Sequence, residues 1–254
     1  IDIIIESGAS LFVSAVGVPP KWAVAKLHAA GIPVMNMIGA PKHVKYALAA
    51  GCDIICAQGG QGGGHTGAVA TNILIPAVVD LCRGRTSPLW GTPVMVVAAG
   101  GIFDGRGLAS SLCMGADGVW VGTRFVCAEE AGAPPHHQQG VLGAGFDDTV
   151  RTVIYTGRPM RVLKSEYIMN WEENRQGEIK ALCAKGKLPI KAEWEALQAA
   201  GKATPELMMS ARPLLMGSCA GAINDILPAK QIVSSMMSEA TNILREKARL
   251  LSRL

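Results

Sequence analysis

The residue pattern predicts an α/β fold in which helices cover a parallel β-sheet. Five short runs are apolar or β-branched at nearly every position, at residues 11–16, 32–38, 53–57, 94–98 and 118–121. Such runs are typical of strands that are buried on both faces. Helix-like stretches that end in glycine separate several of them. The chain therefore repeats a βα unit, and each run is predicted to form one parallel strand.

The ends of the intervening helices carry their own signals. Gly31, Gly51 and Gly115 stand just before predicted strands, where a glycine commonly ends a helix in the left-handed conformation. Pro41 suits a first helical turn, and Asp104 suits the N-cap of a helix over residues 106–114. These signals place the helices between the strands and support the same repeated unit.

After residue 125 the regular alternation of strand-like and helix-like segments ends. The chain is predicted to consist of three parts. Residues 1–164 form a βα region, in which 133–139 are expected to be a loop and 152–164 irregular or short-strand structure. Residues 165–228 are expected to form a helical insertion or lid, interrupted by prolines. Residues 229–254 are expected to form a closing C-terminal helix.

Composition excludes several classes of function. The chain has 254 residues, of which 49% are hydrophobic, and a net charge of +4 without a basic cluster, so binding to nucleic acid is not expected. No apolar run approaches the roughly 20 residues of a membrane span. The seven cysteines lack metal-ligand spacing, so no metal site is predicted and a reduced compartment, the cytoplasm or an organelle, is favoured.

Three glycine-rich turns follow predicted strands and are the candidate site. The first carries His65 among Gly62, Gly63, Gly64 and Gly67. A lone histidine is often an ordinary turn residue, but so many glycines favour close approach of the backbone to a ligand. Since carboxylates are scarce near these turns, a two-carboxylate hydrolase is not favoured.

The other two turns are Gly100-Gly101 and Gly122-Thr123, which stand one βα unit apart. Paired turns of this kind commonly bind phosphate through backbone N–H groups in βα barrels. The remaining histidines, His28, His43, His136 and His137, are given no role in the site.

Three segments resemble the nitronate monooxygenases, formerly called 2-nitropropane dioxygenases. They are AQGGQGGGHTG at residues 57–67, VAAGGIFDG at 97–105 and GADGVWVGTRF at 115–125. The resemblance covers about residues 11–125, and related flavin enzymes include the type II enoyl-acyl-carrier-protein reductases. It implies a TIM-type (β/α)8 barrel that binds FMN. If the five strands are the fourth to eighth of that barrel, this chain lacks the first strands.

The resemblance also implies roles for individual residues. His65 matches the catalytic histidine, Gln58 a glutamine that hydrogen-bonds the flavin ring, and Gly63 a glycine that contacts it. The FMN phosphate is expected on the backbone of Gly100, Gly101, Trp120, Val121, Gly122 and Thr123. Trp120 and Ser218 stand where many members carry glutamine, so side-chain roles at these two positions are in question.

The implied function is oxidation of an alkyl nitronate or nitroalkane by FMN and O2, yielding a carbonyl compound and nitrite. One alternative keeps the fold but changes the chemistry to NAD(P)H-dependent reduction of enoyl thioesters or quinones. Another is an inactive, truncated barrel. A homodimer is left open, and the partners expected are the small-molecule substrate and O2.

Overall fold

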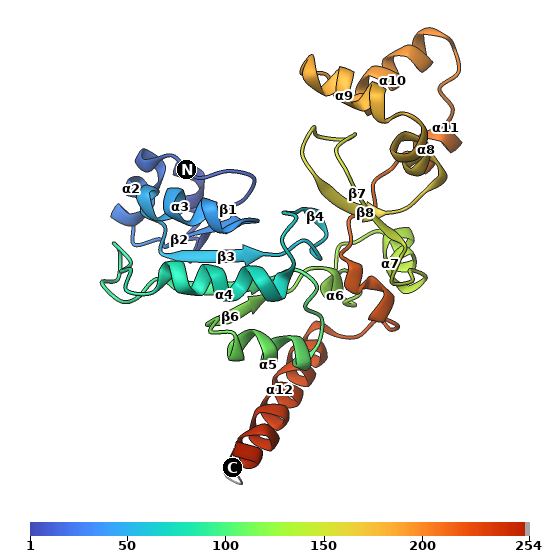
Figure 1. Ribbon diagram of the computed structural model, residues 1–254. Helices are drawn as coiled ribbons and strands as arrows, with labels where there is room; N and C mark the ends of the chain where they lie inside the picture. The colour runs from blue at the N-terminus through green and yellow to red at the C-terminus, as the bar shows by residue number, and fades with distance from the viewer. Residues whose placement is uncertain (252–254) are drawn as a thin grey trace.

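The computed structural model describes residues 1–251, and its centre is a five-stranded parallel sheet (Figure 1). The order is β1-β2-β3-β5-β6, and all five strands predicted from the sequence are confirmed. Within the described residues, β1 and β6 are the two edges and do not pair with each other, so the sheet is open. The strands are β1 (Phe12–Ser14), β2 (Val34–Ile38), β3 (Ile54–Gln58), β5 (Met95–Ala99) and β6 (Gly118–Trp120).

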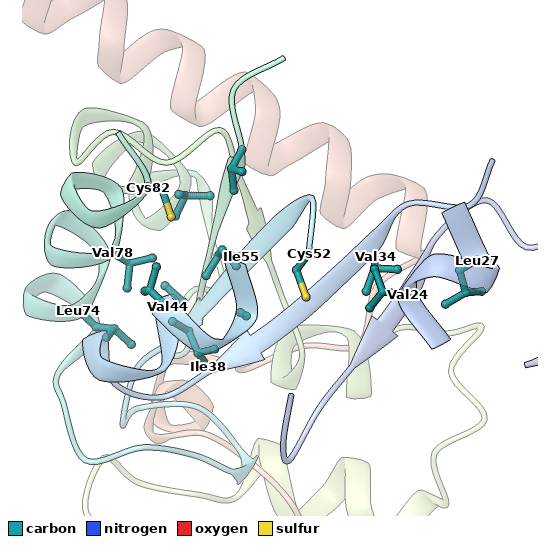
Figure 2. Close-up of a cluster of buried hydrophobic side chains, with 14 of the residues drawn as sticks. Val24, Leu27, Val34, Ile38, Val44, Cys52, Ile55, Leu74, Val78 and Cys82 are labelled. Carbon is teal, nitrogen blue, oxygen red and sulfur yellow. The ribbon is translucent and has the colours of Figure 1, made fainter. Parts of the chain in front are cut away.

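Helices pack against one face of this sheet, where they bury the largest apolar cluster (Figure 2). Val34, Ile38 and Ile55 of the sheet meet Leu27 of α2 and Leu74 of α4 there. The opposite face is also apolar, and this confirms strands that are buried on both sides. The elements of this part are α1 (Asp2–Glu6), α2 (Lys21–Ala29), η1 (Pro41–His43), α3 (Val44–Ala50), α4 (Thr71–Cys82), α5 (Gly105–Cys113) and α6 (Thr123–Val126).

The predicted helix ends are confirmed. Gly31, Gly51 and Gly115 have φ values of 74°, 96° and 92°, which is the left-handed region that glycine enters without steric cost. The Asp104 carboxylate accepts a hydrogen bond from the N–H of Gly107 at 3.0 Å and caps α5. Local sequence signals therefore set the lengths of these βα units.

A second, antiparallel sheet joins the first glycine turn to a ribbon about a hundred residues further along the chain. It contains β4 (Gly64–His65), β8 (Met160–Leu163) and β7 (Thr149–Thr152), in that order. Residues 152–164, expected to be irregular or short-strand structure, contain the end of β7, a connecting turn and β8. Because β4 is two residues long, no periodicity in the sequence could have predicted its pairing with β8.

The loop expected over residues 133–139 is a wrong prediction, since α7 occupies Pro135–Leu142. Pro134 is extended and Pro135 is the first helical residue, where the fixed φ of proline favours the start of a helix. The same reason explains α10 (Pro189–Ala199) and α11 (Pro205–Ser210), in which proline begins the helix and does not interrupt it.

The helical region after residue 164 shares a small apolar core with the β7–β8 ribbon, on which it packs (Figure 1). Ile168, Trp171 and Ile179 are buried there, and Glu193 of α10 accepts hydrogen bonds from Trp171, Tyr167 and Arg175. These contacts tie α10 to α8 and α9. The helices are α8 (Glu166–Asn174), α9 (Gln176–Ala184), α10 and α11, followed by η2 (Ser218–Ala222).

The closing helix is α12 (Ala229–Leu251), which packs along α5. The Glu239 carboxylate accepts from the N–H of Gly105 at 2.7 Å, and Ala240 is buried against Leu108. The last three residues of the predicted helix, 252–254, lie outside the described residues. Among residues 1–251, no helix combines the length and apolar character needed to cross a membrane.

Candidate functional site

A cavity of about 340 Å³ lies at the carboxyl ends of β3, β5 and β6, where all three glycine turns meet. Parallel α/β sheets bind ligands at this edge. Seven of the nine predicted site residues line the cavity, and His65 and Val121 are the two that do not. The lining residues are Gln58, Gly62, Gly63, Gly64, Ala99, Gly100, Gly101, Ile102, Trp120, Gly122, Thr123, Val126, His137, Leu215 and Cys219.

Glycine is required at these turns by packing and by backbone conformation. Gly100 and Gly101 have φ values of 98° and 77°, and a Cβ on Gly100 would stand 2.7 Å from the carbonyl oxygen of Gly59. A Cβ on Gly63 would stand 2.6 Å from the backbone of Met216. The turns therefore pack backbone against backbone, which larger residues would prevent.

Free hydrogen-bond donors remain at the cavity. In the described part of the chain, the N–H groups of Gly100, Gly101 and Gly122 donate to no protein acceptor. Gly100 and Gly101 are half-buried and Gly122 is exposed, so their N–H groups are free to bond water or a bound acceptor. Successive N–H groups at such turns are a common site for anions.

The first glycine turn is held by residues that the sequence analysis did not single out. The side chain of Arg161, on β8, donates from Nε and Nη2 to the Gly60 carbonyl at 3.0 and 2.9 Å. Burial, followed by the charge of Arg151, lowers the pKa of this guanidinium. Thr71 N donates to Gln61 Oε1 at 2.8 Å, and this links the turn to the start of α4.

His65 lies at the edge of the cavity, directly after the lining residue Gly64. Its Nε2 is 2.9 Å from Thr156 Oγ1, and this hydroxyl donates to the Arg158 carbonyl at 3.2 Å. When the hydroxyl hydrogen is donated to the Arg158 carbonyl, the imidazole N–H is at Nε2 and a lone pair is left on Nδ1. His65 can therefore accept a proton at Nδ1.

A loop between α11 and η2 closes the cavity over the first glycine turn. Ser218 N donates to the Gln61 carbonyl at 3.1 Å, and Gly217 N donates to Thr123 Oγ1 at 2.9 Å. Ser218 thus holds the turn through its backbone N–H, a contact that does not depend on the side chain at this position. We call residues 214–219 the strap.

His137 and Cys219 are cavity residues that the sequence analysis missed. His137 Nε2 lies 2.9 Å from the Leu215 carbonyl of the strap, and a carbonyl can only accept, so Nε2 carries the hydrogen. Burial raises the pKa of the Cys219 thiol, and the Thr123 side chain opposes that shift. The sequence analysis expected a loop over 133–139 and gave His137 no role. In the structure His137 belongs to helix α7, which packs against α6 and brings His137 to the cavity.

A comparison with protein families identifies the chain. The model described as nitronate monooxygenase matches residues 1–239. This chain belongs to the nitronate monooxygenase family. The resemblance carried by the three glycine motifs is thereby confirmed.

The relatives of this member of the nitronate monooxygenase family are described with different activities. It is 33% identical to (3aS,4S,5R,7aS)-5-hydroxy-7a-methyl-1-oxo-octahydro-1H-indene-4-carboxyl-CoA dehydrogenase of Mycobacterium tuberculosis, over 96% of this chain and 75% of the relative. FabK from Thermotoga maritima is 27% identical with a TM-score of 0.75, over 98% of this chain and 73% of that one. Nitroalkane oxidase from Streptomyces ansochromogenes is 26% identical with a TM-score of 0.74, over 95% and 67%.

The solved structures are TIM-barrel-type, and the family is one of flavin-dependent oxidoreductases. The cavity fits a phosphate-bearing flavin by two tests. Its volume lies in the range of about 300–1,000 Å³ that small-molecule sites occupy, and unpaired N–H groups at Gly100, Gly101 and Gly122 offer donors to an anion.

Proposed function

We propose that this chain forms the FMN-binding part of a nitronate monooxygenase, which oxidises alkyl nitronates with O2 to carbonyl compounds and nitrite. The observation that carries the proposal is the convergence of three glycine turns, with unpaired N–H groups, on one cavity beside a histidine. Family membership and the likeness to nitroalkane oxidase support a nitro compound as substrate.

Different residues at the cavity would bind different parts of FMN. Backbone N–H groups of Gly100, Gly101 and Gly122 would hold the FMN phosphate, and the half-buried Gln58 amide would face the ring system. Trp120 and Thr123 line the same space, and Val121 stands between them in the chain. Bound FMN would supply the redox chemistry, taking electrons from the substrate and passing them to O2.

The contribution of His65 is proton transfer. Nδ1 would remove the α-proton from a neutral nitroalkane, while Nε2 stays bonded to Thr156 and keeps the ring oriented. Once protonated, the same nitrogen can donate a hydrogen bond to an anionic nitronate. An imidazole suits both tasks, because it accepts and releases protons near neutral pH.

The test compares His65→Ala with wild type on two forms of one substrate. FMN affinity should be unchanged, and oxygen uptake with the neutral nitroalkane should fall by about 10²–10⁴, the usual value of a general base. Uptake with the pre-formed nitronate should fall much less, since no proton has to be removed. His43→Ala, a half-buried histidine at the end of η1 and away from the cavity lining, is the matched control. Equal rates of nitroalkane oxidation in the variant and wild type would remove His65 from the role of base.

A second candidate is a flavin-dependent oxidoreductase of CoA or carrier-protein thioesters. The observation that favours it is the 33% identity to a carboxyl-CoA dehydrogenase over nearly the whole chain. Rapid reduction of the bound flavin by NAD(P)H, or turnover of an acyl-CoA, would favour this reading. Oxygen uptake with nitronate alone would favour the first. Protein that stays colourless after incubation with FMN would indicate an inactive barrel.

A further inference from the structure

The histidine that lines the cavity, His137, takes no part in the proton transfer proposed above for His65. His137 lines the same space as Gly100, Gly101 and Gly122, and its Nε2 is held by the Leu215 carbonyl. No lysine, arginine, aspartate or glutamate is among the lining residues. His137 is therefore the one lining side chain that can carry a positive charge, and Cys219 is the other titratable group there.

The fold connects His137 to the third glycine turn through α6, and to the strap, which also packs on the first glycine turn. The helix that carries His137, α7, packs against α6, whose first residue, Thr123, follows Gly122 directly. Leu215, which His137 holds, stands two residues before Gly217, and the N–H of Gly217 donates to Thr123 Oγ1 at 2.9 Å. The ring of His65 is bonded instead to Thr156, on the segment that leads into β8.

A cationic partner would strengthen the binding of a phosphate monoester in this cavity. The N–H groups of Gly101 and Gly122 are neutral donors, whereas a phosphate carries between one and two negative charges near pH 7. Burying such a charge without a counter-charge is costly, and hydrogen bonds from a charged donor are about twice as strong as neutral ones. Protonated imidazole is a donor at both nitrogens.

We propose that protonated His137 is the cationic partner of the flavin phosphate. Nδ1 donates to a phosphate oxygen while Nε2 remains bonded to the Leu215 carbonyl. This inference rests on the proposed function, because it requires that FMN occupies the cavity. It gives the two histidines different partners: His65 would bind the substrate beside the flavin ring, and His137 would bind the FMN phosphate.

The test compares FMN with riboflavin, which has the same ring and lacks the phosphate. For His137→Ala, the Kd of FMN should rise about 10-fold or more, as expected for a lost charge-assisted hydrogen bond, and the Kd of riboflavin should stay within about twofold. His137→Gln keeps a donor for the Leu215 carbonyl but no charge, so FMN should still bind several-fold more weakly. His136→Ala, an exposed neighbour, should change neither affinity. Fluorescence quenching of each flavin on titration with protein gives both constants.

Two results would overturn the assignment. Unchanged FMN affinity in His137→Ala would show that the side chain does not reach the phosphate. Equal weakening of FMN and riboflavin, in both the Ala and Gln variants, would show that His137 only supports the strap. Wild-type protein that binds neither flavin would refute the proposed function and this inference with it, whereas tight FMN binding by both wild type and His137→Ala would refute the inference alone.

Discussion

Replacing Gly63 by alanine tests whether backbone contact between the first glycine turn and the strap holds the site together. The added Cβ would stand 2.6 Å from the carbonyl carbon of Met216 and 2.8 Å from the nitrogen of Gly217. Both are main-chain atoms, so no flexible side chain can move aside. The φ of Gly63 is outside the left-handed region, and the expected effect is therefore steric only.

The structure gives the size of that effect. To restore ordinary van der Waals contact, the strap has to retreat from 2.6 Å to at least 3.4 Å, a shift of about 0.8 Å. The strap is held at this point by the bonds Gly217 N to Thr123 Oγ1 and Ser218 N to the Gln61 carbonyl, each worth about 1 kcal/mol. Overpacking alone costs about 1–3 kcal/mol. We expect Gly63→Ala to lose about 2–4 kcal/mol of the free energy of unfolding.

Urea denaturation followed by tryptophan fluorescence measures this loss. The matched control is Gly122→Ala, because a Cβ at Gly122 meets no atom within 4 Å and its φ is −106°. The control should change the free energy of unfolding by less than about 1 kcal/mol. If Gly63→Ala unfolds within about 0.5 kcal/mol of wild type, the close packing of turn and strap does not constrain the fold.

Three further predictions concern the cavity and its supports. Gly122→Ala should leave the free energy of unfolding nearly unchanged and weaken FMN binding several-fold, because the added methyl group would enter the space beside the phosphate. The control is Gly118→Ala, where an added Cβ also meets no atom within 4 Å. Equal FMN affinities of Gly122→Ala and wild type would place the phosphate elsewhere. Arg161→Lys should lower the free energy of unfolding by about 1–3 kcal/mol, because lysine cannot reproduce the two hydrogen bonds to the Gly60 carbonyl. Urea denaturation measures this loss, and a variant as stable as wild type would contradict the prediction. Iodoacetamide at neutral pH should label the exposed Cys113 but not Cys56, because the thiolate is the reactive form and burial raises the pKa of the Cys56 thiol to about 12. Mass spectrometry detects the label. Prompt labelling of Cys56 would refute its burial.

Local patterns were sufficient for the parallel strands and for most of the cavity wall. Runs such as residues 54–57 are apolar because both faces of the sheet are buried. Gly51 and Gly115 precede strands because the preceding helices end in the left-handed conformation. Turns at the carboxyl ends of neighbouring parallel strands must lie at one edge. Gly100, Gly101 and Gly122 could therefore be assigned to one site before any coordinates were known.

Long-range contacts carry no comparable local signal. Arg161 reaches the Gly60 carbonyl, the strap crosses Gly63, and His137 enters the cavity, each across roughly 80 to 150 residues of chain. Strand and helix periodicities report which face of an element is buried, but not which distant element covers it. Residue patterns thus indicated the family and predicted the βα repeat and the glycine turns that meet at one cavity. Only the tertiary structure shows how the β7–β8 ribbon, α7 and the strap complete the cavity, because those contacts arise from packing between segments that are remote in sequence.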